Sequence, residues 1–168
     1  MRQLAIVVFL IAACGRPDGA ATRATSSDRD SRAMRIESSA FSAGARIPPK
    51  YTCDGPGPSP PLAFGGVPRA AKALALTVED PDAPSGTFTH WVVWNMPPQT
   101  AGVAEGGRPP GIEGKNDFGN NGWGGPCPPS GEHHYIFTLY ALDAQVADRN
   151  GIAPHAIGKA QLVGTYRR

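Results

Sequence analysis

The sequence predicts a mainly β domain with long loops rich in glycine and proline and a short C-terminal helix. Short apolar runs rich in β-branched and aromatic residues recur along the chain, which is typical of strands. The 21 glycines and 18 prolines among 168 residues separate these runs, and no amphipathic stretch of helical length precedes the C-terminal region. The length fits one domain, and a hydrophobic content of 40% is enough for a packed core.

Strands are expected at five places. The clearest are residues 73–78 (ALALTV), 90–96 (HWVVWNM) and 135–142 (YIFTLYAL), and the weaker ones are residues 36–41 and 62–64. Pro97 ends the second of these strands, because proline cannot donate to a strand ladder. Residues 100–129 form a long loop, and loops of this length in a compact domain are usually functional or mobile.

The helix is predicted within residues 154–166 (PHAIGKAQLVGTY). Its apolar residues Ile157, Ala160 and Val163 recur at helical spacing, and Gly164 ends the pattern.

The N-terminal residues predict export and a lipid anchor. Arg2 precedes an apolar run of ten residues, 4–13, which is too short to span a bilayer but suits the hydrophobic region of a secretory signal. The ending IAAC resembles a bacterial lipobox, in which Cys14 becomes the lipidated first residue. The alternative is a buried N-terminal strand that happens to contain a cysteine.

The chain is therefore divided into three parts. Residues 1–13 are expected to be a lipoprotein signal peptide, residues 14–33 the lipidated Cys14 with a flexible tether of small and charged residues, and residues 34–168 the folded domain. This organisation predicts a protein exported and lipid-anchored to a bacterial cell envelope, facing the periplasm or on the outer membrane. The membrane is then a partner through Cys14.

Two cysteines remain after Cys14, namely Cys53 and Cys127. An oxidising compartment favours a disulfide between them. Two separate buried thiols are equally compatible with the sequence, because it does not give the distance between their Cα atoms.

Two clusters carry residues able to do chemistry. The first, within residues 79–91 (EDPDAPSGTFTHW), holds Asp80, Asp82 and His90, and the second, within residues 124–135 (GGPCPPSGEHHY), holds His133. Each cluster lies where a loop meets a predicted strand. If the two strands are neighbours, the clusters share one end of a sheet.

These side chains suit a small anion. The imidazoles of His90 and His133 can donate N–H bonds to an anionic oxygen, and the carboxylates of Asp80 and Asp82 can orient the rings. A carboxylate left over would suit an amine, which points to zwitterions such as a phospholipid head group. The simpler alternatives are a turn whose aspartates bond their own backbone, and a structural histidine at position 90.

Other classes of site fit less well. Two histidines and a carboxylate match a facial triad by residue type, but the usual metal-ligand spacings are missing, so neither a metal nor a cofactor is expected. Ser85 and Ser130 do not stand in a nucleophile elbow. Cys127 with His133 could form a nucleophile and base, but a cysteine between two prolines is more typical of a structural role. We therefore expect no enzyme. The net charge of +2 is dispersed, so no nucleic-acid partner is expected.

Taken together, several stretches resemble the phosphatidylethanolamine-binding protein family, in its bacterial Raf-kinase-inhibitor-like branch. In chain order they are KYTCDG (50–55), SPPL (59–62), GVP (66–68), DPDAPSGTFTHWVVWNMP (80–97), GKNDFG (114–119), GGPCPPSGEHHYIFTLYALD (124–143) and LVGTY (162–166). The chain departs from the family at residues 149–161, where relatives usually carry a longer helix near the pocket.

The resemblance implies a β-sandwich of antiparallel sheets with a small anion pocket at one end. The ligand-binding residues that it implies are Asp80, Asp82, His90, Gly125, Pro126, His133 and Tyr135. It also implies a non-catalytic protein that binds phosphate or phosphorylethanolamine-like groups. Some family members inhibit kinases or proteases, so inhibition of a cell-envelope protease or kinase-like enzyme through protein contacts stays open, and a weak hydrolase is a third alternative.

Overall fold

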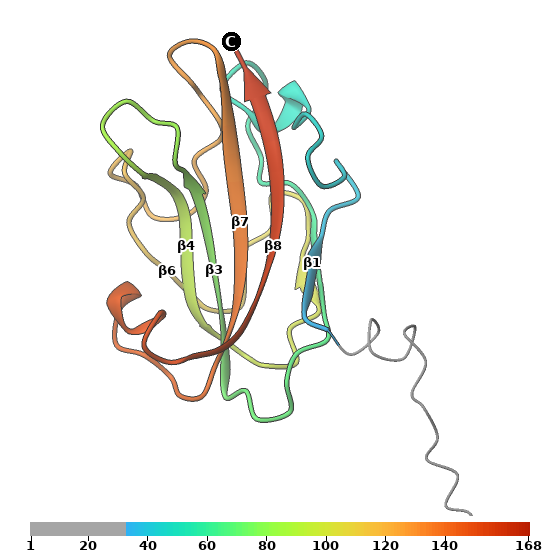
Figure 1. The fold of residues 1–168 in the computed structure, drawn as a ribbon, viewed down its shortest axis with the longest axis vertical. Helices are drawn as coiled ribbons and strands as arrows, with labels where there is room; N and C mark the ends of the chain where they lie inside the picture. Colours follow the sequence, from blue (N-terminus) through green and yellow to red (C-terminus); the bar gives the residue numbers. More distant parts are fainter. Residues whose placement is uncertain (1–32) are drawn as a thin grey trace, which may run out of the picture.

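The computed structural model describes residues 33–168, which fold into two antiparallel sheets (Figure 1). The expected signal peptide, Cys14 and nearly all of the expected tether lie outside the described residues. The smaller sheet has the order β1-β2-β5, with β1 at Arg35–Glu37, β2 at Leu62–Gly65 and β5 at Gly102–Val103. The larger sheet has the order β6-β4-β3-β7-β8, with β6 at Ile112–Glu113, β4 at Phe88–Met96, β3 at Ala73–Asp80, β7 at Glu132–Leu142 and β8 at Ala156–Arg167.

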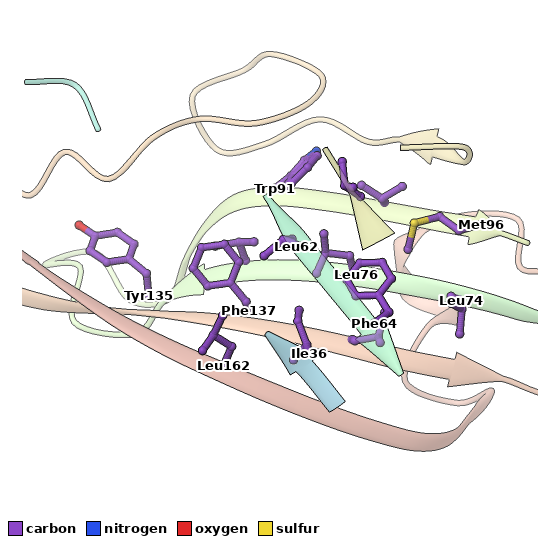
Figure 2. Close-up of a cluster of buried hydrophobic side chains, with 14 of the residues drawn as sticks. Ile36, Leu62, Phe64, Leu74, Leu76, Trp91, Met96, Tyr135, Phe137 and Leu162 are labelled. Atoms are coloured by element: carbon purple, nitrogen blue, oxygen red, sulfur yellow. The ribbon is translucent and has the colours of Figure 1, made fainter. Parts of the chain in front are cut away.

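The main core lies between the two sheets. Figure 2 shows side chains of both sheets meeting there: Ile36, Leu62 and Phe64 come from the smaller sheet, and Leu76, Trp91, Phe137 and Leu162 from the larger. Each fully buried side chain of this kind stabilises the fold by about 1.5–3 kcal/mol. The strand β3 is central and buried on both faces, which is why its sequence is a continuous apolar run rather than an alternating one. The prediction of a mainly β fold is confirmed.

The predicted C-terminal helix was wrong. Its residues form β8, which pairs with β7 along almost its whole length. The inner-facing residues Ala160, Leu162, Gly164 and Tyr166 alternate with outer ones, so the effective period is two rather than 3.6. Gly164 does not end a helix; a side chain there would lie 2.6 Å from Ile47, so the missing Cβ lets the neighbouring chain pack onto the strand. Among residues 33–168, no helix is long and apolar enough to cross a bilayer.

The strand order brings both predicted clusters to one end of the larger sheet, at the top of Figure 1. β3 lies between β4 and β7 and is antiparallel to both, so the end of β3 meets the beginnings of the other two. Asp80 pairs with Phe88 across one ladder, and Glu79 pairs with Ile136 across the other. The condition for a shared end, that the strands carrying the two clusters are neighbours, is met by β3 and β7.

A β-bulge interrupts β4 at this end. Val78 pairs with Trp91 while the next residue of β3, Glu79, pairs with Thr89, so His90 is an extra residue without a partner across the ladder. Bulges turn a side chain away from its regular direction. Trp91 lies in the core between the sheets, and the bulge places the adjacent His90 on that same inner side, where its ring contacts Tyr135.

Candidate functional site

A cavity of about 280 Å³ opens at the end of the inner sheet face where β3, β4 and β7 meet. Polar side chains of Asp80, His90 and His133 line it, and each of these residues is at most 6% exposed. The other lining residues are Ala83, Pro84, Ser85, Phe88, Phe118, Cys127, Pro128 and Pro129. The cavity therefore has a few buried polar groups among mainly apolar walls, which is the usual composition of a small-ligand site.

His90 is fixed by its backbone surroundings. Its Nδ1 lies 2.7 Å from the carbonyl oxygen of Gly124, and its ring packs edge-on against Tyr135 and Phe118. A carbonyl oxygen only accepts hydrogen bonds, so Nδ1 carries the proton and donates it. Burial lowers the pKa of His90, more than the hydrogen bond to Gly124 and the nearby Asp80 carboxylate raise it. Burial therefore favours the neutral form of this imidazole.

His133 is fixed by Asp80. The Nδ1 of His133 donates to Oδ2 of Asp80 over 2.7 Å, and the other carboxylate oxygen, Oδ1, accepts the backbone N–H of Asp82 over 2.8 Å. Asp80 thus orients a pocket histidine, as the sequence predicted, and also closes the turn that follows β3. Each of its oxygens accepts one of these hydrogen bonds, and Asp80 is the carboxylate among the described lining residues.

Both histidines line the cavity and use Nδ1 for a hydrogen bond within the protein. Among residues 33–168, neither Nε2 has a hydrogen-bond partner, and neither is a fully buried unpaired atom. In the neutral ring Nε2 accepts a hydrogen bond, and in the protonated ring it donates one. The cavity therefore carries two groups whose hydrogen-bonding sense depends on a proton.

Asp82 lies outside the cavity lining. Its Oδ2 accepts from both the backbone N–H and the Nδ1 of His134, over 2.8 and 2.7 Å, and these hydrogen bonds lower the pKa of Asp82. The side chain is largely exposed. Asp82 therefore joins the end of β3 to the start of β7 and orients His134 rather than a cavity histidine.

Tyr135 also lies outside the lining, and its ring packs edge-on against the ring of His90. Its side chain is fully buried, and its hydroxyl has no hydrogen-bond partner among the described residues. Burial, together with the carboxylates of Asp80 and Asp82, raises the pKa of Tyr135. The hydroxyl is thus a buried donor that stays protonated.

Gly125 and Pro126 belong to the segment behind the cavity wall. A Cβ on Gly125 would lie 2.8 Å from the carbonyl oxygen of Tyr51, so only glycine allows this approach of two backbones. The carbonyl of Pro126 accepts the N–H of Cys53 over 3.1 Å. Of the two arrangements left open for the cysteines, the structure has the disulfide, which joins Cys53 to Cys127.

The sequence did not single out the aromatic part of the rim. Phe88 and Phe118 pack edge to face with ring centroids 4.7 Å apart, and Phe118 is 48% exposed. Phe118 lies in a loop that Asn116 holds together. The side-chain amide of Asn116 donates to the carbonyl oxygen of Gly122, and its Oδ1 accepts the backbone N–H of Asn120. The feature of the sequence that could have indicated this rim is Phe118, an aromatic residue within a polar loop. In the part of the chain that the structure describes, no group of three or more His, Cys, Asp or Glu side chains is placed to hold a metal ion.

Sequence comparisons agree with this architecture. A family model described as phosphatidylethanolamine-binding protein matches residues 37–167. A UPF0098 protein from Methanothermobacter thermautotrophicus is 47% identical over 150 residues, which is 80% of this chain and 99% of the relative. A UPF0098 protein from Chlamydia trachomatis is 43% identical over 149 residues, again 80% of this chain and 99% of the relative.

Solved structures give the same result. A phosphatidylethanolamine-binding protein homologue from Chlamydia trachomatis superposes with a TM-score of 0.78 at 43% identity, covering 82% of this chain and 99% of the other. YbcL of E. coli, a member of the same family, gives a TM-score of 0.76 at 28% identity, covering 80% and 98%. The fold and the cavity define a small β-sandwich binding protein. More specifically, the chain belongs to the phosphatidylethanolamine-binding protein family, whose members are generally non-catalytic.

Proposed function

We propose that this chain is a non-catalytic binding protein whose cavity accepts a phosphate-like anionic group, either free or as part of a phosphorylethanolamine-like head group. The observation that carries the proposal is that His90 and His133 line one small cavity and each uses Nδ1 within the protein, so that Nε2 is without a partner among the described residues. Once protonated, two imidazoles from separate strands can each donate from Nε2, which suits a tetrahedral anion because its oxygens diverge.

The charge of the cavity favours binding in which either the ligand or the imidazoles carry an additional proton. No lysine or arginine is among the described lining residues, and the only formal charge is that of Asp80. A dianion would be repelled unless the imidazoles were protonated or the ligand itself carried a hydrogen. Burial of His90 strengthens any such interaction, since charges attract more strongly away from water.

The walls support a small anionic group attached to something less polar. Proline and phenylalanine side chains surround the polar floor, including Pro84, Pro128 and Phe118. The family model that matches residues 37–167 is described as phosphatidylethanolamine-binding protein, which is compatible with this interpretation. A lipidated Cys14 would hold the cavity near a membrane surface, and this part of the proposal depends on the sequence pattern alone.

The test is a titration of the full chain with inorganic phosphate and, separately, with phosphorylethanolamine, followed by imidazole and amide NMR shifts. We expect saturable shifts around His90 and His133 that are lost in His90→Ala. The matched control is His155→Ala, because His155 also pairs with an aspartate, Asp143, but is not part of the cavity lining. Equal affinity of the wild type and His90→Ala would refute the proposal and favour a protein-contact inhibitor. Tighter binding of phosphorylethanolamine than of phosphate would identify the head group as the ligand.

A further inference from the structure

The disulfide between Cys53 and Cys127 forms part of the cavity wall and is accessible from outside. Cys127 lines the anion cavity, and both cysteines line a second hollow of about 310 Å³. Cys53 is exposed and Cys127 is partly exposed. Disulfides with a purely structural role are usually shielded from thiols, whereas exposed ones are the labile ones.

A guanidinium group lies against one of the two sulfurs. Nη1 of Arg168 is 3.5 Å from Sγ of Cys127. Its Nε pairs with Oδ1 of Asp54 over 3.2 Å, and the hydroxyl of Tyr166 donates to Oδ2 of Asp54 over 2.7 Å. Asp54 offsets part of the positive charge, but the two contacts also hold the guanidinium in place beside the sulfur. A nearby cation stabilises a thiolate and lowers the pKa of its thiol.

These contacts make the two sulfurs unequal in an exchange reaction. The attacking thiolate needs access, which favours Cys53, and the leaving sulfur needs stabilisation as a thiolate, which favours Cys127 beside Arg168. We propose that the Cys53–Cys127 bridge is a redox-active disulfide, which exchanges with a dithiol through attack at Cys53 and departure of Cys127.

The exchange has two steps. A thiolate of the dithiol forms a bond to Sγ of Cys53, the Sγ–Sγ bond breaks, and its electron pair stays on Cys127 as a thiolate. The second thiolate of the dithiol then attacks the reagent sulfur of the mixed disulfide and releases Cys53. The bridge has gained two electrons, the dithiol has become a disulfide, and the two thiol protons end on Cys53 and Cys127.

Opening the bridge changes the anion cavity. The Cys127 side chain then contributes a thiol to the cavity wall, and in its ionised form it adds a negative charge to the one on Asp80. Anion binding is expected to weaken on reduction, a consequence that rests on the proposed function. The exchange chemistry does not rest on it, and its kinetics are measured without any anion.

The experiment exposes the folded full chain to dithiothreitol without denaturant and, in a second series, to the monothiol glutathione. Samples are quenched in acid, alkylated and mapped by peptide mass spectrometry. We expect a reduction rate proportional to thiolate concentration and a first glutathione adduct on Cys53 with alkylation on Cys127. A rate that levels off at the rate of global unfolding, or a first adduct on Cys127, would overturn the proposal.

Arg168→Gln tests the role of the guanidinium, with the adjacent exposed Arg167→Gln as its control. If Arg168 lowers the pKa of the leaving thiol by about one unit, and the sensitivity resembles a Brønsted coefficient of about 0.4–0.5, reduction slows about threefold. We expect this loss in Arg168→Gln and no change in Arg167→Gln. The same rate in both variants would show that the sulfurs are not distinguished by Arg168.

Discussion

Anion binding by this cavity should require a proton on His90. The Nδ1 proton is committed to the carbonyl of Gly124, so Nε2 can donate to an anionic oxygen only when the ring is cationic. Burial lowers the pKa of His90, and a bound anion is expected to raise it again. The carboxylates of Asp80 and Asp117 raise the pKa of His90, but by less than burial lowers it.

The sign and the size of the pH dependence follow from this linkage. The pKa of His90 is higher in the complex than in the free protein, so binding is strongest below the free-protein value. The affinity is then lost as the pH rises through the value in the complex. Between these two limits, one proton enters with each anion, and the affinity falls about tenfold per pH unit, or about 1.4 kcal/mol. The lowered free-protein pKa places the start of this window below the usual imidazole value of about 6.5.

Sulfate is the appropriate probe, because it stays fully ionised in this range and cannot supply the proton itself. Isothermal titration calorimetry in buffers of different ionisation enthalpy counts the protons taken up with each sulfate. His90→Gln should lose one proton from that count, since the glutamine amide donates without titrating, whereas His155→Gln should behave as the wild type. Sulfate affinity that does not vary between about pH 5 and 8, or a count unchanged in His90→Gln, would refute the reasoning.

Three further predictions concern the frame around the cavity. Gly164→Ala should lower the free energy of unfolding by about 1–3 kcal/mol in chemical denaturation, because its Cβ would meet Ile47 and Phe41 at 2.6 and 2.8 Å. Gly158→Ala, whose nearest atom is the flexible Met34 sulfur at 3.1 Å, should lose less, and equal losses would contradict this packing. Replacing both cysteines of the bridge by serine should cost about 4.5 kcal/mol, the chain-entropy value for a separation of 74 residues, and an unchanged midpoint of unfolding would contradict that value. Tyr135→Phe removes an unpaired buried hydroxyl, so it should leave both phosphate affinity and melting temperature unchanged or slightly raised, and a clear loss of affinity would instead make the hydroxyl a ligand donor.

The sequence predicted the central strands well because their signal is local. The runs around residues 73–78, 90–96 and 135–142 are apolar and β-branched, and each lies within a strand of the structure. The strand β8 was missed because its residues Ile157, Ala160 and Val163 also fit a helical period. Pairing with β7 and contact with Ile47 decide between the two patterns, and both are tertiary effects. The short strands β5 and β6 have two residues each and no pattern of their own.

The candidate site was predictable in part for a similar reason. Asp80, His90 and His133 were found because charged and imidazole groups beside strand ends are conspicuous in a sequence. The partners that fix their orientation were not predictable, because a carbonyl such as that of Gly124 has no signature in the sequence. Asp82 was predicted to orient a cavity histidine, and this was wrong. Of the two adjacent histidines, His133 pairs with Asp80 and His134 pairs with Asp82.

Because of the bulge at His90, the position of this side chain depends on one extra residue in β4, which the pairing of β4 with β3 does not need. A deletion of one residue between Phe88 and His90 would let β4 pair with β3 without interruption, and the sheet and core could survive it. The imidazole, however, would be lost from the cavity or turned to the opposite face. A single codon deletion is therefore expected to keep this fold and to remove the proposed anion site. In a relative of similar fold, the number of residues from the aspartate at the end of β3 to the core tryptophan of β4 is thus a direct indicator of a retained site.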